Sequence, residues 1–255
     1  MKKNKKPIEF YSTQSLDNDD KELVLEVLNS DYLTTGPKIE KFENLIGSYC
    51  KNAFALAVNS GTSALTLAYE VCEVGIRSLV WTTPLTFVAT AACAVRLGAS
   101  IDFVDIDPET LNICPILLEK KLETAKKHSI LPDVVTVVHF AGSPVDMEHI
   151  ANLAKKYKFK IIEDASHAFG SIFKDQVIGQ NKFSDVTVFS FHPVKIITTG
   201  EGGAVLVSDK EDFLKARSLR SHGINRDSLD SCENPPAWFY EQNMLGYNFR
   251  MSELH

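Results

Sequence analysis

The sequence lacks a long apolar run, a secretory signal and an excess of basic residues. Its longest apolar stretch, at 87–101, is interrupted by Arg96, so no segment is predicted to span a membrane. The basic start, MKKNKKP, is followed by no apolar region of the kind that a secretory signal contains. The formal net charge of −6 gives no reason to expect a nucleic-acid partner.

Cysteine is scarce, and patterns of cysteine that bind metal or carry redox chemistry are missing. No two of the five cysteines form a C-x-x-C pair; they are Cys50, Cys72, Cys93, Cys114 and Cys232. This spacing favours reduced thiols in a cytoplasmic protein over disulfide bonds or a zinc site, and we expect no metal ion.

Seven short runs of β-branched and aromatic residues are present, and helical patterns separate most of them. The runs are 53–58, 78–82, 100–106, 134–140, 160–165, 185–191 and 203–208. The helical patterns are 63–74, 87–98 and 146–159, the last with Asp146 as its N-cap. This alternation predicts an α/β domain with a mostly parallel seven-stranded sheet sandwiched by helices. No helix separates the last two strands, which allows an antiparallel pair there. The segment 226–242 is predicted as an irregular excursion around Pro235 and Pro236.

Ligands of open α/β sheets bind beyond the carboxyl ends of the strands, and the sequence NSGTSAL (59–65) follows one such end. A glycine turns the chain there, and a helix is predicted to begin with Thr62 and Ser63. Free N–H groups and hydroxyls at a helix start can bind an anion. The same residues would also serve as an ordinary helix cap.

Two acids close another predicted strand in IIEDASHAFG (161–170). Glu163 and Asp164 should point to opposite faces of the sheet. A carboxylate at this end of a buried strand can hold a protonated ring nitrogen or a metal ion. The alternative is a cap or an ion pair.

The sequence SFHPVKIITTGEGG (190–203) places Lys195 among apolar residues, shortly after a strand that ends at Ser190. Loss of hydration lowers the pKa of a lysine and makes its amine a nucleophile able to form a Schiff base. The alternative is a buried stem with a hydrated ammonium group. The glycines that follow match neither the Walker nor the G-x-G-x-x-G pattern, which argues against an ATPase or a nicotinamide-dependent dehydrogenase.

The three segments together fit one cofactor better than three unrelated roles. Pyridoxal 5′-phosphate (PLP) needs a site for its phosphate, an acid for its pyridine nitrogen and a lysine for its aldehyde. The chain supplies these groups in that order, each at the end of a predicted strand. The sequence therefore predicts a PLP enzyme.

The blocks LTTGP, NSGTSAL, EDASHAFG, SFHPVK, GEGGAV and GYNFRMSEL resemble those of the DegT/DnrJ/EryC1/StrS family of fold type I sugar aminotransferases, from about Ile8 to the last residue. The resemblance implies an N-terminal segment and helix at 1–30, a PLP-binding large domain at 31–225, and an excursion with the start of a C-terminal region at 226–255. It also implies that the small C-terminal domain of the relatives is largely missing, so we expect a truncated form.

The resemblance implies a role for each of three catalytic residues. Lys195 would form the Schiff base with the cofactor and move the proton between the amino donor and the cofactor. Asp164 would pair with the protonated pyridine nitrogen. His167 would lie near the O3′ oxygen of the ring.

The resemblance also implies the residues that bind the cofactor. Thr62, Ser63 and Ser190 would hold its phosphate, and Phe87 would stack on its ring. Asn248 would reach the phosphate of the neighbouring subunit in a homodimer.

The implied reaction transfers an amino group from L-glutamate, which leaves as 2-oxoglutarate, to C4 of a UDP-linked 4-keto-6-deoxy-N-acetyl sugar. Such a reaction serves pseudaminic acid and cell-surface glycan synthesis. His222 and Arg250 would lie near the sugar or the second subunit. Some relatives are dehydratases with histidine in place of the lysine, and Lys195 argues against that chemistry. Two alternatives stay open: another nucleotide-linked keto sugar, and a non-catalytic fragment.

Overall fold

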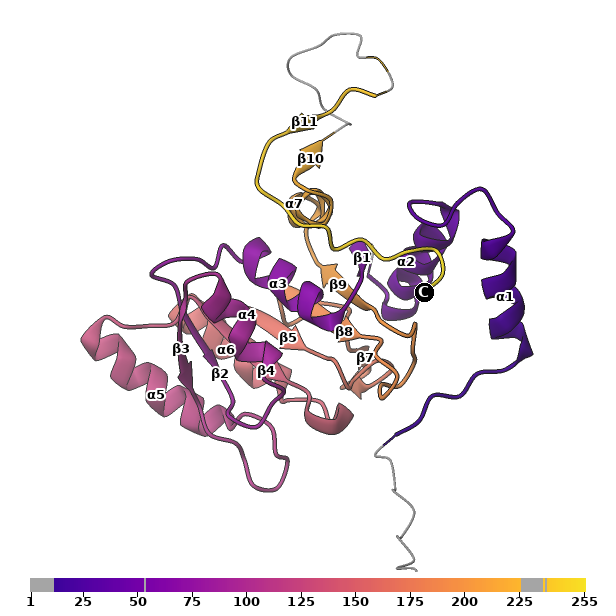
Figure 1. Ribbon diagram of the computed structural model, residues 1–255. Coiled ribbons are helices and arrows are strands. Elements are labelled where there is room, and N and C mark those ends of the chain that lie inside the picture. Colours follow the sequence, from indigo (N-terminus) through magenta and orange to yellow (C-terminus); the bar gives the residue numbers. More distant parts are fainter. Residues whose placement is uncertain (1–11, 53, 226–235, 237) are drawn as a thin grey trace, which may run out of the picture.

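The computed structural model of the chain describes residues 12–52, 54–225, 236 and 238–255 (Figure 1). Residue 53, the basic start, Cys232, Pro235 and most of the predicted excursion lie outside the described residues. In the part of the chain that is described, no helix has both the length and the apolar character needed to cross a bilayer.

A seven-stranded sheet forms the centre of the molecule, with the strand order β1-β9-β8-β5-β4-β2-β3. Its strands are β1 (Phe54–Val58), β2 (Leu79–Thr82), β3 (Ser100–Phe103), β4 (Val134–Val138), β5 (Lys160–Asp164), β8 (Val186–Ser190) and β9 (Gly203–Val207). All seven predicted strands are confirmed, with ends that differ by a few residues. Strand β9 runs antiparallel to both β1 and β8, and the other neighbouring strands are parallel. Strands β8 and β9, which follow each other in the sequence without a helix between them, are therefore antiparallel.

Seven α-helices and two small hairpins surround the sheet in the described part of the chain. The helices are α1 (Asn18–Leu28), α2 (Pro37–Cys50), α3 (Gly61–Val71), α4 (Ala89–Arg96), α5 (Pro115–His128), α6 (Met147–Tyr157) and α7 (Lys210–Arg220), with a 3-10 turn at η1 (Phe140–Gly142). The hairpins pair β6 (Ile172–Phe173) with β7 (Gln176–Val177), and β10 (Ile224–Asn225) with β11 (Glu241–Gln242). The side chain of Asp146 caps α6 as predicted, by accepting from the His149 N–H.

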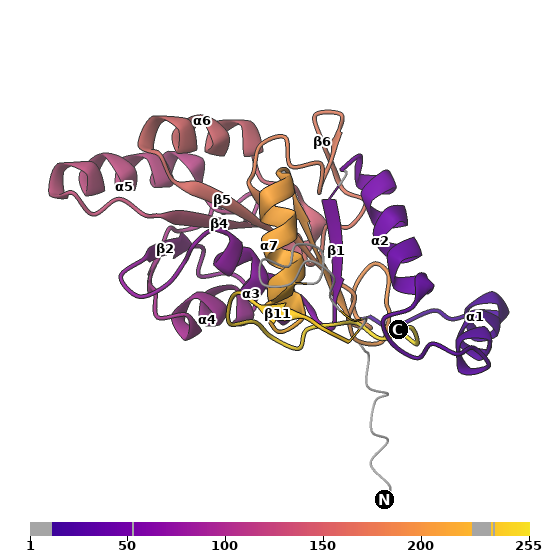
Figure 2. The same ribbon diagram turned by 90° about the horizontal axis from the view of Figure 1, so that it is seen from above.

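Alternate side chains along the strands enter two apolar layers, one on each face of the sheet. Leu56, Ile162 and Val205 pack on the face that α3, α4 and α7 cover. Side chains such as Val137 and Ile161 pack on the opposite face, which α2, α5 and α6 cover. The view from above shows α3 and α4 on one side of the sheet and α5 and α6 on the other (Figure 2). Burial of both faces explains why the strands are apolar nearly throughout.

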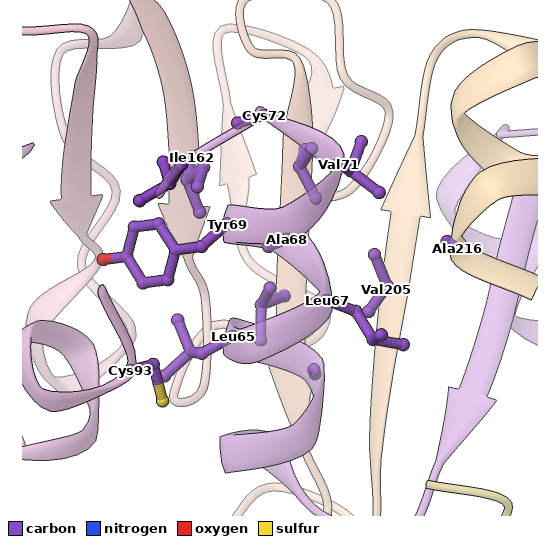
Figure 3. Close-up of a cluster of buried hydrophobic side chains, with 14 of the residues drawn as sticks. Leu65, Leu67, Ala68, Tyr69, Val71, Cys72, Cys93, Ile162, Val205 and Ala216 are labelled. Carbon is purple, nitrogen blue, oxygen red and sulfur yellow. The ribbon is translucent and has the colours of Figure 1, made fainter. Parts of the chain in front are cut away.

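Helix α3 is buried along most of its length and fixes the end of β1 against the sheet. Its side chains meet Cys93 of α4, Ile162 of β5, Val205 of β9 and Ala216 of α7 (Figure 3). The N-terminus of α3 is held by Ser60, whose side chain accepts from the Ser63 N–H at 3.1 Å. This packing places the start of α3 beside the carboxyl ends of β5 and β8.

Candidate active site

A pocket of about 470 Å³ opens at the carboxyl ends of β4, β5 and β8. The predicted site residues among those that line it are Thr62, Phe87, Asp164, His167, Ser190 and Lys195. They come from four separate stretches of sequence, and the parallel strands bring them to one edge of the sheet. A larger groove, of about 700 Å³, lies between α2 and α7 and contains none of the predicted site residues.

Asp164 ends β5 and is 4% exposed, with its carboxylate at the wall of the pocket. Oδ1 accepts from the backbone N–H and the hydroxyl of Ser166, at 3.2 and 2.6 Å. Oδ2 accepts from the hydroxyl of Thr90 at 2.7 Å. A buried carboxylate with several donors is satisfied as an anion, so the site contains a fixed negative charge.

Lys195 and His167 face this carboxylate across the pocket. Burial lowers the pKa of the Lys195 ammonium below its usual value, and the nearby charge of Asp164 opposes that shift. Burial also lowers the pKa of His167, the positive charge of Lys195 lowers it further, and Asp164 opposes both effects. Near neutral pH the imidazole is therefore neutral, and the amine of Lys195 loses its proton more readily than an exposed lysine.

The apolar neighbours of Lys195 do not enclose it, contrary to the sequence interpretation. Ile196 is 66% exposed, and Val194 and Ile197 are each 37% exposed. Of the three, Val194 lines the pocket beside Lys195, whereas Ile196 and Ile197 do not. The lowered pKa of Lys195 comes from its partial burial there.

The start of α3 forms the end of the pocket nearest to β8. The first N–H groups of a helix have no partner within the helix, and here they belong to Gly61 and Thr62. A Cβ atom at residue 61 would lie 2.8 Å from the Cβ of Ser190, so only glycine lets the helix approach this closely. The hydroxyl-bearing side chains of Thr62 and Ser190 both line the pocket.

Ser63 lies next to Thr62 at the start of α3 but does not line the pocket. It is 6% exposed, and its hydroxyl donates to Oδ1 of Asn59 at 2.6 Å. The sequence interpretation gave Ser63 the same role as Thr62, whereas the structure makes it part of the turn that begins α3. Successive residues at the beginning of a helix point in different directions, and their positions in the motif alone do not show which of them faces the pocket.

Glu163 points away from Asp164, as strand alternation predicts, and joins a buried cluster. Its Oε2 is 2.7 Å from Nε2 of His139, and its Oε1 accepts from the hydroxyls of Ser184 and Thr187. Nδ1 of His139 accepts from the Val145 N–H at 3.0 Å, so Nε2 carries the proton that reaches Glu163. Glu163 is therefore satisfied by hydrogen bonds within the chain, whereas Asp164 lines the pocket.

Phe87 lies at the mouth of the pocket, where it is 71% exposed. Its neighbour Val88 is 70% exposed. A flat ring in this place can cover one face of a planar ligand that enters the pocket.

The structure does not bring the remaining predicted residues into the pocket. His222 and Asn248 are exposed, and Arg250 is partly buried, in the segments that follow α7. The Asn248 carbonyl accepts from Nδ2 of Asn59 at 3.4 Å, so its backbone runs beside the turn before α3. Asn248 is therefore near the start of α3 without lining the pocket.

Sequence reasoning missed the residues that hold the predicted ones in place. Ser166 could have been found, because a serine two residues after a strand-terminal aspartate often bonds to it. Thr90 is 74 residues from Asp164, and His139 is 24 residues from Glu163. Nothing local marks such tertiary contacts.

The arrangement has the chemistry of a site for a planar, anionic aldehyde. The pocket has the volume of a small-molecule site, about 300–1,000 Å³. Lys195 offers an amine with a lowered pKa, Asp164 places a carboxylate on the wall, and the start of α3 offers N–H groups and hydroxyls that could bind an anion. The residues present therefore fit PLP.

Comparisons with known proteins give the same assignment. A family model described as the DegT/DnrJ/EryC1/StrS aminotransferase family matches residues 14–255. Over 246 residues the chain is 43% identical to the UDP-4-amino-4,6-dideoxy-N-acetyl-beta-L-altrosamine transaminase of Campylobacter jejuni, which covers 96% of this chain and 61% of that protein.

Solved structures with the same fold include Helicobacter pylori PseC, an aminotransferase involved in the biosynthesis of pseudoaminic acid. It matches with a TM-score of 0.86 and 35% identity, over 96% of this chain and 62% of that one. Spr1654 of Streptococcus pneumoniae in its PLP-form gives a TM-score of 0.83 and 27% identity, over 97% of this chain and 64% of that one. The chain thus spans less than two thirds of the length of each of these proteins.

Proposed function

Because the chain belongs to the DegT/DnrJ/EryC1/StrS aminotransferase family, we propose that it binds PLP and transfers an amino group to a nucleotide-linked keto sugar. One observation carries this proposal: Lys195, Asp164, His167 and the start of α3 line one pocket at the strand ends. All of them lie within 31–225, the segment that we assign as the cofactor domain.

PLP, when bound, supplies an aldehyde that captures amines and a protonated ring that accepts electrons from the neighbouring carbon. The chain supplies the orientation. Thr62, Ser190 and the free N–H groups of α3 bind the phosphate, and Asp164 holds the ring nitrogen in its protonated form. Phe87 covers one face of the ring.

Lys195 would anchor the aldehyde and, when released, would serve as a general acid and base. Its lowered pKa makes the free amine more accessible than that of an exposed lysine, so Nζ could accept the proton that an amino donor releases. His167 is held neutral by burial and by Lys195, and it can donate a hydrogen bond to the O3′ oxygen of the cofactor.

The substrate proposal comes from the relatives. The Campylobacter jejuni protein is named a transaminase of a UDP-linked 4-amino-4,6-dideoxy sugar. We assign to this chain L-glutamate as the donor, 2-oxoglutarate as its product, and a UDP-linked 4-keto-6-deoxy-N-acetyl sugar as the acceptor. His222 and Arg250 are assigned to the sugar or to a second subunit.

We assign the active assembly as a homodimer in which Asn248 reaches the phosphate site of the partner. Two features support this arrangement. Asn248 is exposed and does not line the pocket of its own chain. Helix α1 lies apart from the sheet, buries only Val27, and leaves Leu23, Leu25 and Leu28 exposed (Figure 2).

The test is cofactor capture by the purified chain. Added PLP should produce a visible absorption band, and reduction with borohydride should fix the cofactor to Lys195, as read by peptide mass spectrometry. Lys195→Ala should lose both signals. Lys174→Ala, which removes an exposed lysine bonded to Glu148, is the matched control and should keep both. Labelling of another lysine, or an unchanged band in Lys195→Ala, would contradict the proposal.

A further inference from the structure

Thr90 contacts the carboxylate of the site from behind. It is fully buried near the start of α4, and its hydroxyl donates to Oδ2 of Asp164 at 2.7 Å. The hydroxyl lies behind the wall of the pocket, because Asp164 lines that wall and Thr90 does not. Its contact with a ligand can therefore only be indirect, through Asp164.

The hydrogen-bond pattern fixes the direction in which the hydroxyl of Thr90 donates. Its Oγ1 is 2.7 Å from the hydroxyl of Thr86. A hydroxyl has a single proton, and an ionised carboxylate only accepts, so Thr90 donates to Asp164 and Thr86 donates to Thr90. The side chain of Thr90 therefore has one arrangement that satisfies both neighbours.

The backbone of Thr90 is held as firmly as its side chain. Its N–H donates to the Phe87 carbonyl at 3.1 Å, and its own carbonyl accepts from the hydroxyl of Tyr69 at 2.6 Å. Burial raises the pKa of Tyr69, so the phenol keeps the proton that it donates. Tyr69 also meets Thr136 of β4 at 2.9 Å, which ties the network to the sheet.

The donors around Asp164 leave room for one more hydrogen bond. Each carboxylate oxygen can accept about two hydrogen bonds. The N–H and hydroxyl of Ser166 occupy Oδ1, whereas Oδ2 accepts only from Thr90 among the residues that the structure describes. A single acceptor site is thus left on Oδ2, on the oxygen whose direction Thr90 determines.

We infer that Thr90 is a positioning residue that aims Oδ2 of Asp164 at one N–H donor of the ligand, and so selects a cofactor with a protonated ring nitrogen. This inference rests on the proposed function. Ser166 belongs to the same segment as Asp164 and moves with it, whereas Thr90 belongs to another element. Thr90 is therefore the group that fixes the carboxylate relative to the pocket.

The test compares the dissociation constants of PLP and of its 1-deaza analogue, in which a C–H group replaces the ring nitrogen. The analogue cannot donate to Asp164, and the intrinsic differences between the two rings are the same for every variant, so the change in this ratio from one variant to another measures the pairing. The wild-type chain should prefer PLP. In Thr90→Val and Thr90→Ala the Oδ2 atom is no longer held toward the ring nitrogen, so each variant should weaken the preference by roughly tenfold, the size expected when a hydrogen bond to a charged group is lost.

Two variants serve as controls. Thr90→Ser keeps the hydroxyl and should keep the preference. Thr82→Val removes another fully buried hydroxyl, one that donates to the Thr136 carbonyl at 2.9 Å, and it should keep the preference as well. Equal weakening of both ligands by Thr90→Val would indicate a structural role only and would overturn the inference.

Asp164→Asn separates this inference from the proposed function. Loss of the preference in Asp164→Asn, together with full preference in Thr90→Val, would contradict the role of Thr90 and leave the cofactor assignment standing. A wild-type chain that binds the two ligands equally would contradict the pairing with Asp164 itself, and with it the proposed site.

Discussion

Glu163 and Asp164 are adjacent in the sequence, yet the alternation of side chains along β5 gives them separate tasks. Glu163 is surrounded by donors that come from the chain itself, at His139, Ser184 and Thr187. Asp164 is left with one acceptor site facing a pocket. The chemical identity of the two residues is nearly the same, and the number of donors around each decides which of them meets a ligand.

His167 gives a prediction about pH. Burial and the charge of Lys195 lower its pKa below the usual 6.5. As the pH falls through 6.5, the unfolded chain therefore takes up this proton before the folded chain does, and the free energy of unfolding decreases. In the cofactor-free protein, the wild-type chain should lose more stability between pH 8 and pH 5.5 than His167→Gln loses.

Urea unfolding at the two pH values measures this difference. His128, exposed in the last turn of α5, supplies the matched control, and His128→Gln should follow the wild-type chain. An equal decrease in the free energy of unfolding for the wild-type chain and His167→Gln would show that the imidazole is not held neutral by its surroundings.

At the scale of elements, the strands were predictable because the apolar sequence of each strand reflects its burial. Runs such as 134–138 are buried on both faces, and such strands are apolar throughout whatever their neighbours are. The order of the strands was not predictable in the same way, because it depends on contacts between distant segments. The short hairpin β6–β7 lacks an apolar run and was missed.

The same distinction holds for the site. Residues at strand ends, such as Asp164 and Lys195, could be predicted because the parallel sheet collects them at one edge. The groups that orient them could not, because Thr90 approaches from another element. Ser63 was predicted as a site residue from its place in the motif. Its hydroxyl instead bonds to Asn59 in the turn before α3, and the motif does not show this.

The cluster around Glu163 joins the ends of β4, β5 and β8, and it gives a prediction about stability. Glu163→Leu would leave the donors of His139 and Thr187 buried without this acceptor, and it would also remove the acceptor of the half-buried Ser184. A buried donor left without a partner costs about 1–3 kcal/mol of the free energy of unfolding. Urea unfolding of the cofactor-free protein should show a loss of this size, with Glu163→Gln in between.

Thr83 provides a contrasting control. Its hydroxyl is buried and has no hydrogen-bond partner among the residues that the structure describes. Replacing an unsatisfied buried hydroxyl by an apolar group of the same shape is neutral or stabilising, by about 1 kcal/mol at most. Thr83→Val should therefore not destabilise the protein, and a small effect of Glu163→Leu beside it would contradict the role of the cluster.

At the scale of the whole molecule, the last residues of the chain connect two distant helix starts. The Glu253 carboxylate accepts from the N–H groups of Gly36, Lys38 and Ile39, at 2.9, 2.7 and 3.3 Å, and so caps α2, which has no N-cap side chain of its own. A few residues earlier, the Phe249 carbonyl accepts from the Asn59 N–H at 2.9 Å, beside the start of α3. The segment between these contacts is therefore held across the surface next to the proposed phosphate site.

This placement leads to a prediction for Asn248, which lies at that surface with an exposed side chain. If Asn248 meets the phosphate of a second chain, Asn248→Asp brings two negative charges together and should weaken PLP binding by about tenfold, because like charges at an interface are strongly unfavourable. The effect requires two chains, so it should disappear when the protein is diluted until it is monomeric. PLP titrations over a range of protein concentrations, with sedimentation velocity at each, measure both the affinity for PLP and the oligomeric state.

Asn44→Asp is the control, because it adds the same charge to an exposed site on α2 and should leave PLP binding unchanged. A loss of affinity that persists in the monomer would place Asn248 at the site of its own chain, and equal affinities at every concentration would remove it from the phosphate site altogether.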